Sequence, residues 1–197
     1  VADEKVMTAV LRKYGITPPY LLFVSTLQPR KNLIRLIEAF TQAQTSHQLV
    51  LAGKVGWLAQ PILDAVADHQ RLLPSGAPAI VLPGFVDDDD KAALISGATA
   101  VLYPSLYEGF GFPVLEAQAC GAPVLCANTS SLPEVAGEAA LLVDPLDTAA
   151  IRDGIHRLVR DPLLRAELVE AGLENVKRFT WEETAVRILD VLEEAGK

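Results

Sequence analysis

Two glutamates lie eight residues apart in the stretch YEGFGFPVLE, at Glu108 and Glu116. A helix turns once every 3.6 residues, so this spacing could place both carboxylates on one helix face. Gly109, Gly111 and Pro113 lie between them, however, and glycine and proline mark a loop. We therefore expect Glu108 in a loop and Glu116 in the first turn of the helix that follows, where the two carboxylates have different roles.

A glycine-rich loop that leads into a helix is a binding site for anions. The first N–H groups of a helix have no partner within it, and the helix dipole places positive charge at that end. Glycines also let the backbone approach a ligand closely. Carboxylates beside such a site are poor phosphate ligands, but they accept hydrogen bonds from hydroxyl groups. Together these features predict a ligand with a phosphate and several hydroxyls, such as a sugar nucleotide.

Each glutamate also has a simpler interpretation. Taken alone, Glu108 fits a solvated loop charge, and Glu116 fits an acid that the helix dipole stabilises by about 0.3–1 kcal/mol. The glycine-rich loop between them favours the functional interpretation. A dinucleotide fingerprint is rejected, because G-x-G-x-x-G would need glycine where Val114 stands and because the stretch follows the fourth expected strand, not the first.

A second candidate is the basic pair in STLQPRKNLIRL, residues 25–36. Arg30 and Lys31 follow the first expected strand and open the first expected helix. Cations oppose the dipole at a helix start, and an anion bound between them would offset that cost. On this stretch alone, a solvated basic turn is an equally good interpretation.

Other clusters carry no chemistry that we can identify. The four aspartates of PGFVDDDD, residues 83–90, have no accompanying histidine, cysteine or second acidic group, so they indicate a charged helix start and not a metal site. The sequence also contains neither a G-x-S-x-G nucleophile elbow nor a Walker loop. We predict no metal and no cofactor.

Composition excludes several classes of protein. The chain has 197 residues, a formal net charge of −8 and no block of lysine and arginine, which disfavours nucleic-acid binding. Its apolar runs are far too short for a transmembrane segment. Cys120 and Cys126 match no zinc spacing and make no disulfide framework, so we expect buried free thiols in a reducing compartment and a cytoplasmic protein.

Short apolar runs alternate with helical patterns along the chain. The expected strands are 18–26, 47–53, 78–86, 99–105, 122–127 and 139–145. The expected helices are 31–43, 56–73, 87–98, 113–121, 131–137, 147–159, 161–177 and 181–195. Strands without polar alternation are buried on both faces, which indicates a parallel sheet. We predict an α/β fold, a Rossmann-like doubly wound six-stranded sheet with helices on both faces, whose ligand lies at the carboxyl ends of the strands.

The stretch PSLYEGFGFPVLEAQACGAPVLCANTSSLPEVAGEAALLVDPLD resembles the C-terminal, donor-binding half of retaining glycosyltransferases of the GT-B fold, family 4. FVSTLQPRKNLIRLIEAF and LAGKVGW resemble earlier signatures of the family, in the same order, and the resemblance covers residues 18–195. It implies transfer of a hexose from a nucleotide sugar to a glycan or lipid-linked acceptor, without a metal.

The resemblance also implies residue roles. Glu108 contacts hydroxyls of the donor sugar near the reaction centre, and Glu116 holds the ribose. Lys31, which we group with Glu108 as catalytic, neutralises the diphosphate. The amides of Phe110, Gly111 and Phe112 face the sugar, those around Val114 and Leu115 face the phosphates, and Gly84 to Val86 lie against the base.

The chain departs from the family pattern at Thr26, where many members carry an arginine as a second phosphate cation. Either Arg30 replaces that arginine or the phosphate is held less firmly. Mannosyltransferase-like members share the Thr-x-x-Pro-Arg-Lys-Asn pattern that starts at Thr26, which favours GDP-mannose over other nucleotide sugars as the donor.

The full family fold has two Rossmann-like domains, and the acceptor binds mainly to the N-terminal one. We expect residues 1–197, which begin at Val1 and end in a helix at 181–197, to form a single donor domain without its acceptor domain. Such a half would bind nucleotide sugar weakly and be inactive alone, and the full-length protein would be cytoplasmic or peripheral at the membrane. The alternatives are a sugar-nucleotide epimerase and a stand-alone nucleotide-sugar-binding module.

Overall fold

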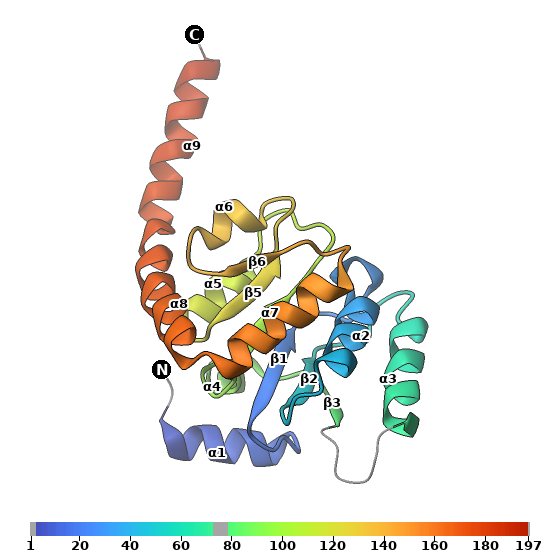
Figure 1. Ribbon diagram of the computed structural model, residues 1–197. Coiled ribbons are helices and arrows are strands. Elements are labelled where there is room, and N and C mark those ends of the chain that lie inside the picture. Colours follow the sequence, from blue (N-terminus) through green and yellow to red (C-terminus); the bar gives the residue numbers. More distant parts are fainter. Residues whose placement is uncertain (1–2, 73–78, 197) are drawn as a thin grey trace.

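A computed structural model describes residues 3–72 and 79–196 of the chain. Within these residues, six strands form one parallel sheet in the order β3-β2-β1-β4-β5-β6 (Figure 1). The strands are β1 (Tyr20–Val24), β2 (Gln48–Ala52), β3 (Ile80–Gly84), β4 (Ala100–Tyr103), β5 (Val124–Ala127) and β6 (Leu141–Val143). This order is that of a Rossmann-like doubly wound domain. The predicted fold class is confirmed.

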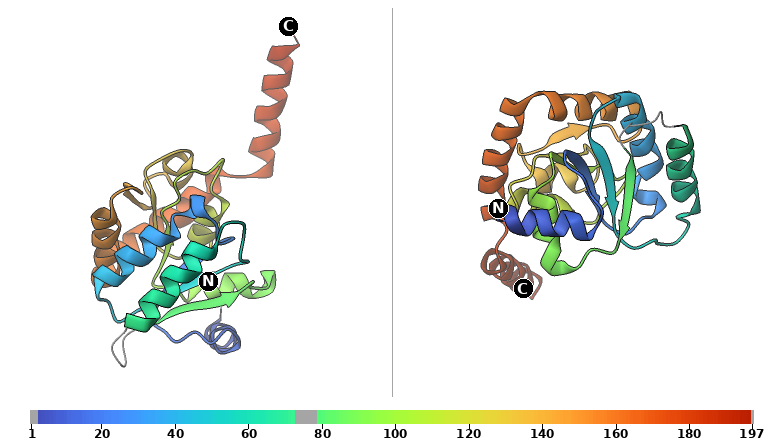
Figure 2. Two further views of the ribbon diagram at one scale, coloured as in Figure 1. Left: turned by 90° about the vertical axis from the view of Figure 1, so that its right-hand side faces the viewer. Right: turned by 90° about the horizontal axis from the view of Figure 1, so that it is seen from below.

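Helices cover both faces of the sheet. They are α1 (Glu4–Lys13), α2 (Leu33–Ala43), α3 (Gln60–Leu72), α4 (Asp88–Ser96), α5 (Phe112–Ala119), α6 (Leu132–Ala136), α7 (Thr148–Arg160), α8 (Pro162–Asn175) and α9 (Trp181–Ala195), with 3-10 turns η1 (Pro29–Lys31) and η2 (Val176–Arg178). α2 packs against α3 and α7, whereas α4 packs against α1 and α5 (Figures 1 and 2). Right-handed crossovers explain this division, because the chain reverses its direction of winding after β3.

The observed strands are shorter than predicted, because the apolar runs continue into the loops at the ends of the strands. The expected helix at 31–43 starts only at Leu33, since Asn32 has a left-handed backbone (φ 61°) that separates η1 from α2. Similarly, α3 starts at Gln60 and not at residue 56, after Leu58 with φ 51°. Residue 73 of the predicted helix 56–73 and residue 78 of the predicted strand 78–86 lie outside the described part of the chain.

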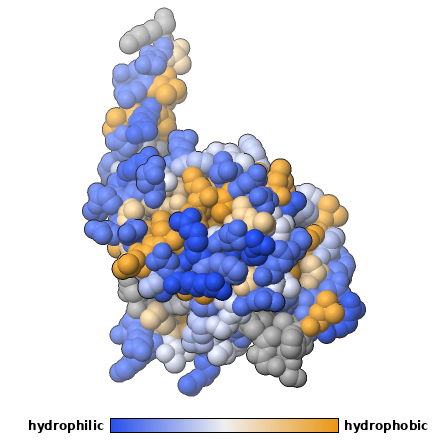
Figure 3. Space-filling view, in the orientation of Figure 1, coloured by the Kyte–Doolittle hydropathy of each residue, from blue (hydrophilic) through white to orange (hydrophobic). Residues whose placement is uncertain are grey.

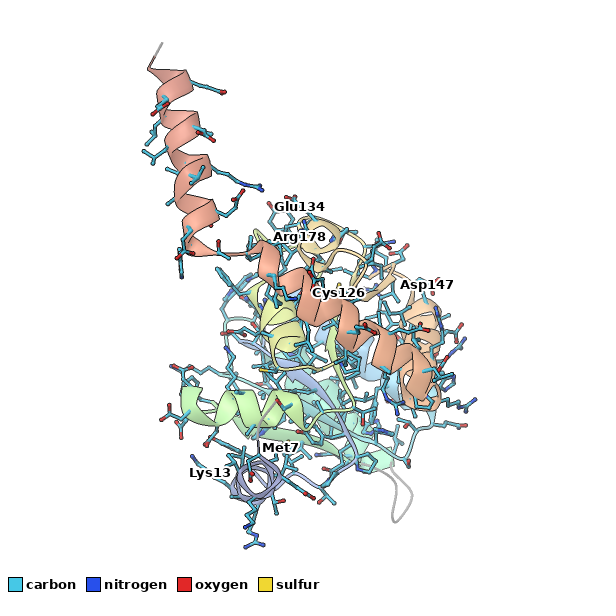
Figure 4. The ribbon with its side chains drawn as sticks, turned by 90° about the vertical axis from the view of Figure 1, so that its left-hand side faces the viewer. Met7, Lys13, Cys126, Glu134, Asp147 and Arg178 are labelled. Carbon is cyan, nitrogen blue, oxygen red and sulfur yellow. The ribbon has the colours of Figure 1, made fainter. Side chains whose placement is uncertain are left out.

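Helix α1 had no counterpart in the sequence prediction. Asp3 caps it by accepting a hydrogen bond from the Lys5 N–H at 2.8 Å, and Val10 is buried against the body of the domain. Lys13, labelled in Figure 4, contacts the start of α4 from the last turn of this helix. α1 therefore belongs to the domain and supports the segment that follows β3.

Helix α9 projects away from the rest of the domain (Figures 1 and 2). Its apolar side chains are exposed: Trp181, Val186, Ile188, Leu189, Val191 and Leu192. Figure 3 shows hydrophobic side chains among hydrophilic ones on the visible face of the projecting helix. Among the described residues, no helix is both long enough and apolar enough to cross a membrane.

Candidate functional site

The candidate site is built around the carboxylate of Glu108, which lies in the loop after β4. Lys31 donates to Glu108 Oε1 at 2.6 Å, and Arg30 donates to Glu108 Oε2 at 2.5 Å. Only 7% of Glu108 and 2% of Lys31 are exposed. Glu108 is thus a loop residue as predicted, but it is buried and paired. The anion between the two cations is this carboxylate.

Asn32 holds the two cations against the Glu108 loop. Its side-chain amide donates to Pro104 O at 3.0 Å and to Pro145 O at 2.7 Å, which ties η1 to the segments after β4 and β6. The Leu106 N–H also donates to Arg30 O at 2.8 Å. β1 and β4 are neighbours whose connections leave on opposite faces, and ligands of such folds bind at this switch point. The ion cluster therefore lies at the topological switch point of the sheet.

Tyr103 forms the floor of the cluster. Its hydroxyl accepts a hydrogen bond from Lys31 Nζ, which lies 4.7 Å from the centre of the Tyr103 ring, and Phe23 stacks on that ring. Sequence reasoning missed Tyr103, since a tyrosine that ends an apolar strand is normally a core residue. Burial raises the pKa of Tyr103, and the nearby Glu108 charge adds to that effect.

The two central ionisable groups shift in directions that follow from their surroundings. Burial lowers the pKa of Lys31, and the hydrogen bond to Glu108 only partly opposes this. Burial alone would raise the pKa of Glu108, but hydrogen bonds from Lys31 and Arg30 outweigh it, so this pKa lies below its ordinary value. Glu108 is therefore an ionised acceptor at neutral pH and not a proton donor.

The loop from Glu108 to α5 is held from one side by two serines. The Glu108 N–H donates to Ser130 Oγ at 3.1 Å, while Ser131 Oγ donates to Glu108 O at 2.9 Å and to Phe110 O at 2.5 Å. Gly111 has φ 124°, and a Cβ there would lie 2.8 Å from Leu132 Cδ2. This position therefore requires glycine.

The predicted phosphate-facing amides begin α5. The Val114 N–H donates to Gly111 O at 2.9 Å within the first turn, and Val114 is buried while Leu115 is half-buried. Phe110 and Phe112 are 37% and 64% exposed, with ring centres 4.8 Å apart. The loop therefore presents both aromatic rings at the surface beside the helix start.

Glu116 is not in the first turn of its helix, which corrects the sequence prediction. α5 starts at Phe112, one residue before Pro113, so Glu116 is its fifth residue and lies beyond the first turn, where the dipole effect falls off. Its Oε1 accepts a hydrogen bond from Lys91 Nζ of α4. Its side chain is 37% exposed. Sequence reasoning missed Lys91, whose partner is set by the packing of α4 on α5.

A pocket of about 290 Å³ lies at the carboxyl ends of β1, β2 and β3. It is lined by Val24, Ser25, Thr26, Ala52, Gly53, Lys54, Phe85, Val86, Asp88 and Lys91. Thr26 and Val86 are thus brought together, and Gly84 (φ 77°) ends β3 just before the lining residue Phe85. Glu116 pairs with the lining residue Lys91, which joins the pocket to α5, whereas Glu108, Arg30 and Lys31 do not line it.

The four aspartates form a charged helix start, as predicted. Asp88, Asp89 and Asp90 occupy the first turn of α4. Lys13 of α1 contacts Asp87 at 2.8 Å and Asp90 at 2.5 Å. In the described ranges, no three His, Cys, Asp or Glu side chains are grouped so that they could hold a metal ion.

The two cysteines are free thiols with different surroundings. Cys126 is buried in β5, and burial raises its pKa to about 12, whereas Cys120 is only half-buried. A thiol with such a pKa stays protonated and is a poor nucleophile. Buried thiols were predicted at both positions, and Cys126 alone is fully buried.

Comparison with known proteins relates this geometry to a family. The family model for glycosyl transferases group 1 matches residues 10–175. The O-antigen chain mannosyltransferase B of Escherichia coli is 36% identical over 186 residues, which cover 92% of this chain and 48% of that protein. The serotype-specific mannosyltransferase WbdA of Escherichia coli is 34% identical over 178 residues, covering 88% of this chain and 21% of that protein.

Solved structures share the fold. Sucrose-phosphate synthase from Thermosynechococcus elongatus superimposes with a TM-score of 0.80 at 27% identity, covering 95% of this chain and 48% of that chain. The chain therefore spans about half the length of that synthase and of the mannosyltransferase B.

Proposed function

The chain belongs to the group 1 glycosyl transferases, and on this basis we propose that it is the C-terminal, donor-binding domain of a retaining GT-B glycosyltransferase of family 4. The observation that carries this proposal is the buried Glu108, paired with Lys31 and Arg30 beside a glycine-rich helix start. A carboxylate, two cations and a helix N-terminus close to one another are the groups that a sugar diphosphate requires.

In the proposed complex, the donor extends from the pocket at the ends of β1, β2 and β3 past the start of α5 to Glu108. The base lies against Gly84 and Val86, near Thr26, and Glu116 accepts hydrogen bonds from the ribose hydroxyls. The start of α5, with the amides around Val114 and Leu115, faces the diphosphate. The loop amides of Phe110, Gly111 and Phe112 face the sugar, whose hydroxyls donate to Glu108.

The proposed chemistry stabilises a leaving diphosphate. Negative charge develops on the diphosphate as the bond to the sugar breaks, and fixed cations and helix dipoles lower the energy of that state. Lys31 and Arg30 supply these cations when they turn from Glu108 to the phosphate oxygens. With this charge in place, we propose that transfer needs no metal and retains the configuration of the sugar, as in the family 4 enzymes that the sequence resembles.

We propose mannose as the transferred hexose and GDP-mannose as the donor. The basis is similarity to two mannosyltransferases, 36% and 34% identical, together with the pattern that starts at Thr26. The acceptor is a glycan or a lipid-linked glycan, and the full-length enzyme acts in the cytoplasm or at the membrane surface. Neither the comparisons nor the paired state of Glu108 supports an epimerase.

We further propose that an acceptor domain completes the enzyme, so that this domain alone binds donor without turning it over. The chain spans 48% of the mannosyltransferase B, and α9 carries an exposed apolar face that suits contact with another domain. Residues 1–197 then form one domain, with 181–197 as its C-terminal helix.

Titration calorimetry tests the donor role. We expect the chain to bind GDP-mannose and GDP, and to bind UDP and UDP sugars more weakly. Glu116→Ala removes a charged acceptor and should weaken GDP binding by about tenfold or more. Glu170→Ala, on the exposed face of α8, serves as the control and should change nothing. No heat with any of these nucleotides would refute the proposal.

Activity of the full-length enzyme tests the residue roles. Glu108→Ala should abolish transfer without weakening nucleotide binding, because we place Glu108 on the sugar and not on the nucleotide. Glu116→Ala should mainly raise the donor KM. Turnover that survives both substitutions would show that the roles are assigned wrongly.

A further inference from the structure

The base of α9 packs directly on the loop between Glu108 and Glu116. Phe179 connects η2 to α9, and its ring meets the Phe110 ring edge-on, with centres 5.9 Å apart and an interplanar angle of 85°. Phe110 in turn contacts Phe112 at 4.8 Å. These three rings, which we call the aromatic cluster, join the two segments although Phe110 and Phe179 are far apart in sequence.

The segment before Phe179 is firmly anchored to the domain. Asn175 is 8% exposed, and its amide donates to Gln118 Oε1 of α5 at 2.8 Å and to Val135 O of α6 at 2.9 Å. Arg178 donates to Asn175 Oδ1 at 2.8 Å, and Figure 4 shows it at the foot of α9. Phe179 therefore extends from a fixed base.

The segment after Phe179 has no such anchor. Thr180 caps α9 by accepting from the Glu183 N–H at 3.1 Å, and in the described residues of α9 no side chain is buried. Phe179 is thus the junction between an anchored base and a projecting helix.

The loop 109–112 is attached to the domain on two sides. Ser130 and Ser131 hold the backbone at Glu108 and Phe110 from the direction of α6. Gly109 and Gly111 flank Phe110, and glycine restricts the backbone least of all residues. The contact between the Phe110 and Phe179 rings is therefore the side-chain attachment at the centre of this loop.

We propose that Phe179 is a positioning residue that holds the loop 109–112 in place and ties it to the base of α9. It fixes the backbone amides of that loop, so a change in the seating of α9 changes their order. The further statement that these amides contact the donor sugar rests on the proposed function.

Backbone 15N relaxation of the chain tests the attachment without any ligand. In the wild-type chain we expect order parameters of about 0.85 at Gly109, Phe110 and Gly111, as in rigid backbone, and below about 0.6 in Phe179→Ala. Phe179→Leu keeps an apolar contact but lacks the ring edge, so its order parameters should lie between those of the wild type and Phe179→Ala. Trp181→Ala is the matched control, since Trp181 is 84% exposed and lies two residues away.

Unchanged resonances of the strand residues would show that Phe179→Ala remains folded. If Phe179→Ala does not fold, the order parameters of Phe179→Leu provide the test instead. Wild-type order parameters at 109–111 in both variants would overturn the proposal. So would equal loosening in Trp181→Ala, because the ring contact would then not be the cause.

Binding separates the positioning role from the proposed function. Phe179→Ala should weaken binding of GDP-mannose about two- to tenfold relative to GDP, the range that an aromatic pair supports. An unchanged ratio, with the loop loosened in the relaxation data, would overturn the statement that the loop amides contact the donor sugar. If the wild-type chain binds neither nucleotide, the proposed function fails, while the relaxation data still decide whether Phe179 holds the loop.

Discussion

Replacing Glu108 by glutamine tests the central ion cluster. The substitution keeps the shape of the side chain and a carbonyl acceptor but removes the negative charge. Lys31, whose side chain is 3% exposed, then remains buried without its carboxylate, while Arg30, whose side chain is 42% exposed, can turn to solvent. The loss should therefore come almost entirely from Lys31.

The size of this loss follows from burial. Breaking a buried ion pair by removing one partner costs about 3–5 kcal/mol, and exposed pairs are worth about 0–1 kcal/mol. Tyr103 and the new amide still accept from Lys31, so we expect the lower value, about 3 kcal/mol. For a domain of this size that lowers Tm by about 6–12 °C.

The assay is urea unfolding followed by circular dichroism, with Glu116→Gln as the matched control. Glu116 has an equivalent pair with Lys91, but the two side chains are 37% and 27% exposed. Its substitution should cost less than about 1 kcal/mol. Equal stability of the two variants would refute the reasoning, because burial would then not distinguish the pairs.

The same substitution has an opposite effect on ligand binding. Lys31 and Arg30 are held by Glu108 in this structure, so a diphosphate must compete with that carboxylate for them. Removing the charge frees the cations, and Glu108→Gln should bind pyrophosphate more tightly than the wild type in calorimetry. Weaker binding would show that the cations do not reach the phosphates.

Three further predictions concern the support of the site. Gly53→Ala should destabilise the chain by more than about 1–3 kcal/mol in urea unfolding, because its Cβ would lie 1.9 Å from Ser25 O at φ 148°; Gly109→Ala, with no atom within 4 Å, should be nearly neutral. Asn32→Ala should lower the free energy of unfolding by about 2–4 kcal/mol, because it removes buried hydrogen bonds and places alanine at a left-handed backbone position. Asn32→Gly should recover about 1 kcal/mol of this loss, because glycine adopts that backbone without strain. Equal losses in the two variants would exclude backbone strain. The pKa of Glu108 in the folded chain lies below its ordinary value, so the stability that this carboxylate contributes is complete above the ordinary pKa and is lost as the pH falls through the folded pKa. Glu108→Gln should therefore flatten the acid limb of a curve of unfolding free energy against pH. An unchanged acid limb would contradict the assignment.

Much of the fold could be predicted because local pattern and global fold agree. The continuous apolar runs around Leu21 to Phe23 and Val101 to Tyr103 are fully buried strands, and Gly111 and Pro113 mark the loop and helix start between the glutamates. The basic pair at Arg30 and Lys31 indicated a bound anion, whereas in the structure the group between the two cations is a carboxylate of the chain itself. Its identity as Glu108 was not predicted, because no local rule joins residues that are 77 positions apart.

The features that were missed depend on tertiary packing. Lys91 follows four aspartates, so the sequence indicates a lysine that neutralises their charge. In the structure it donates a hydrogen bond to Glu116, because α4 packs against α5. Tyr103 looks like a core residue and carries a buried hydroxyl contact as well. The start of α5 shifted by one residue, which moved Glu116 out of the first turn and removed the dipole as an explanation for it.

The pairing of β1 with β4 has a consequence for biosynthesis. Lys31 contacts Tyr103 and Glu108 across separations of 72 and 77 residues, so the two sides of the ion cluster emerge from the ribosome at well-separated times. Closing a loop of that length costs about 4 kcal/mol of chain entropy, which β1 alone cannot offset. The ion cluster therefore forms only after the β4 segment has docked against β1, so its assembly marks the joining of the two halves of the sheet.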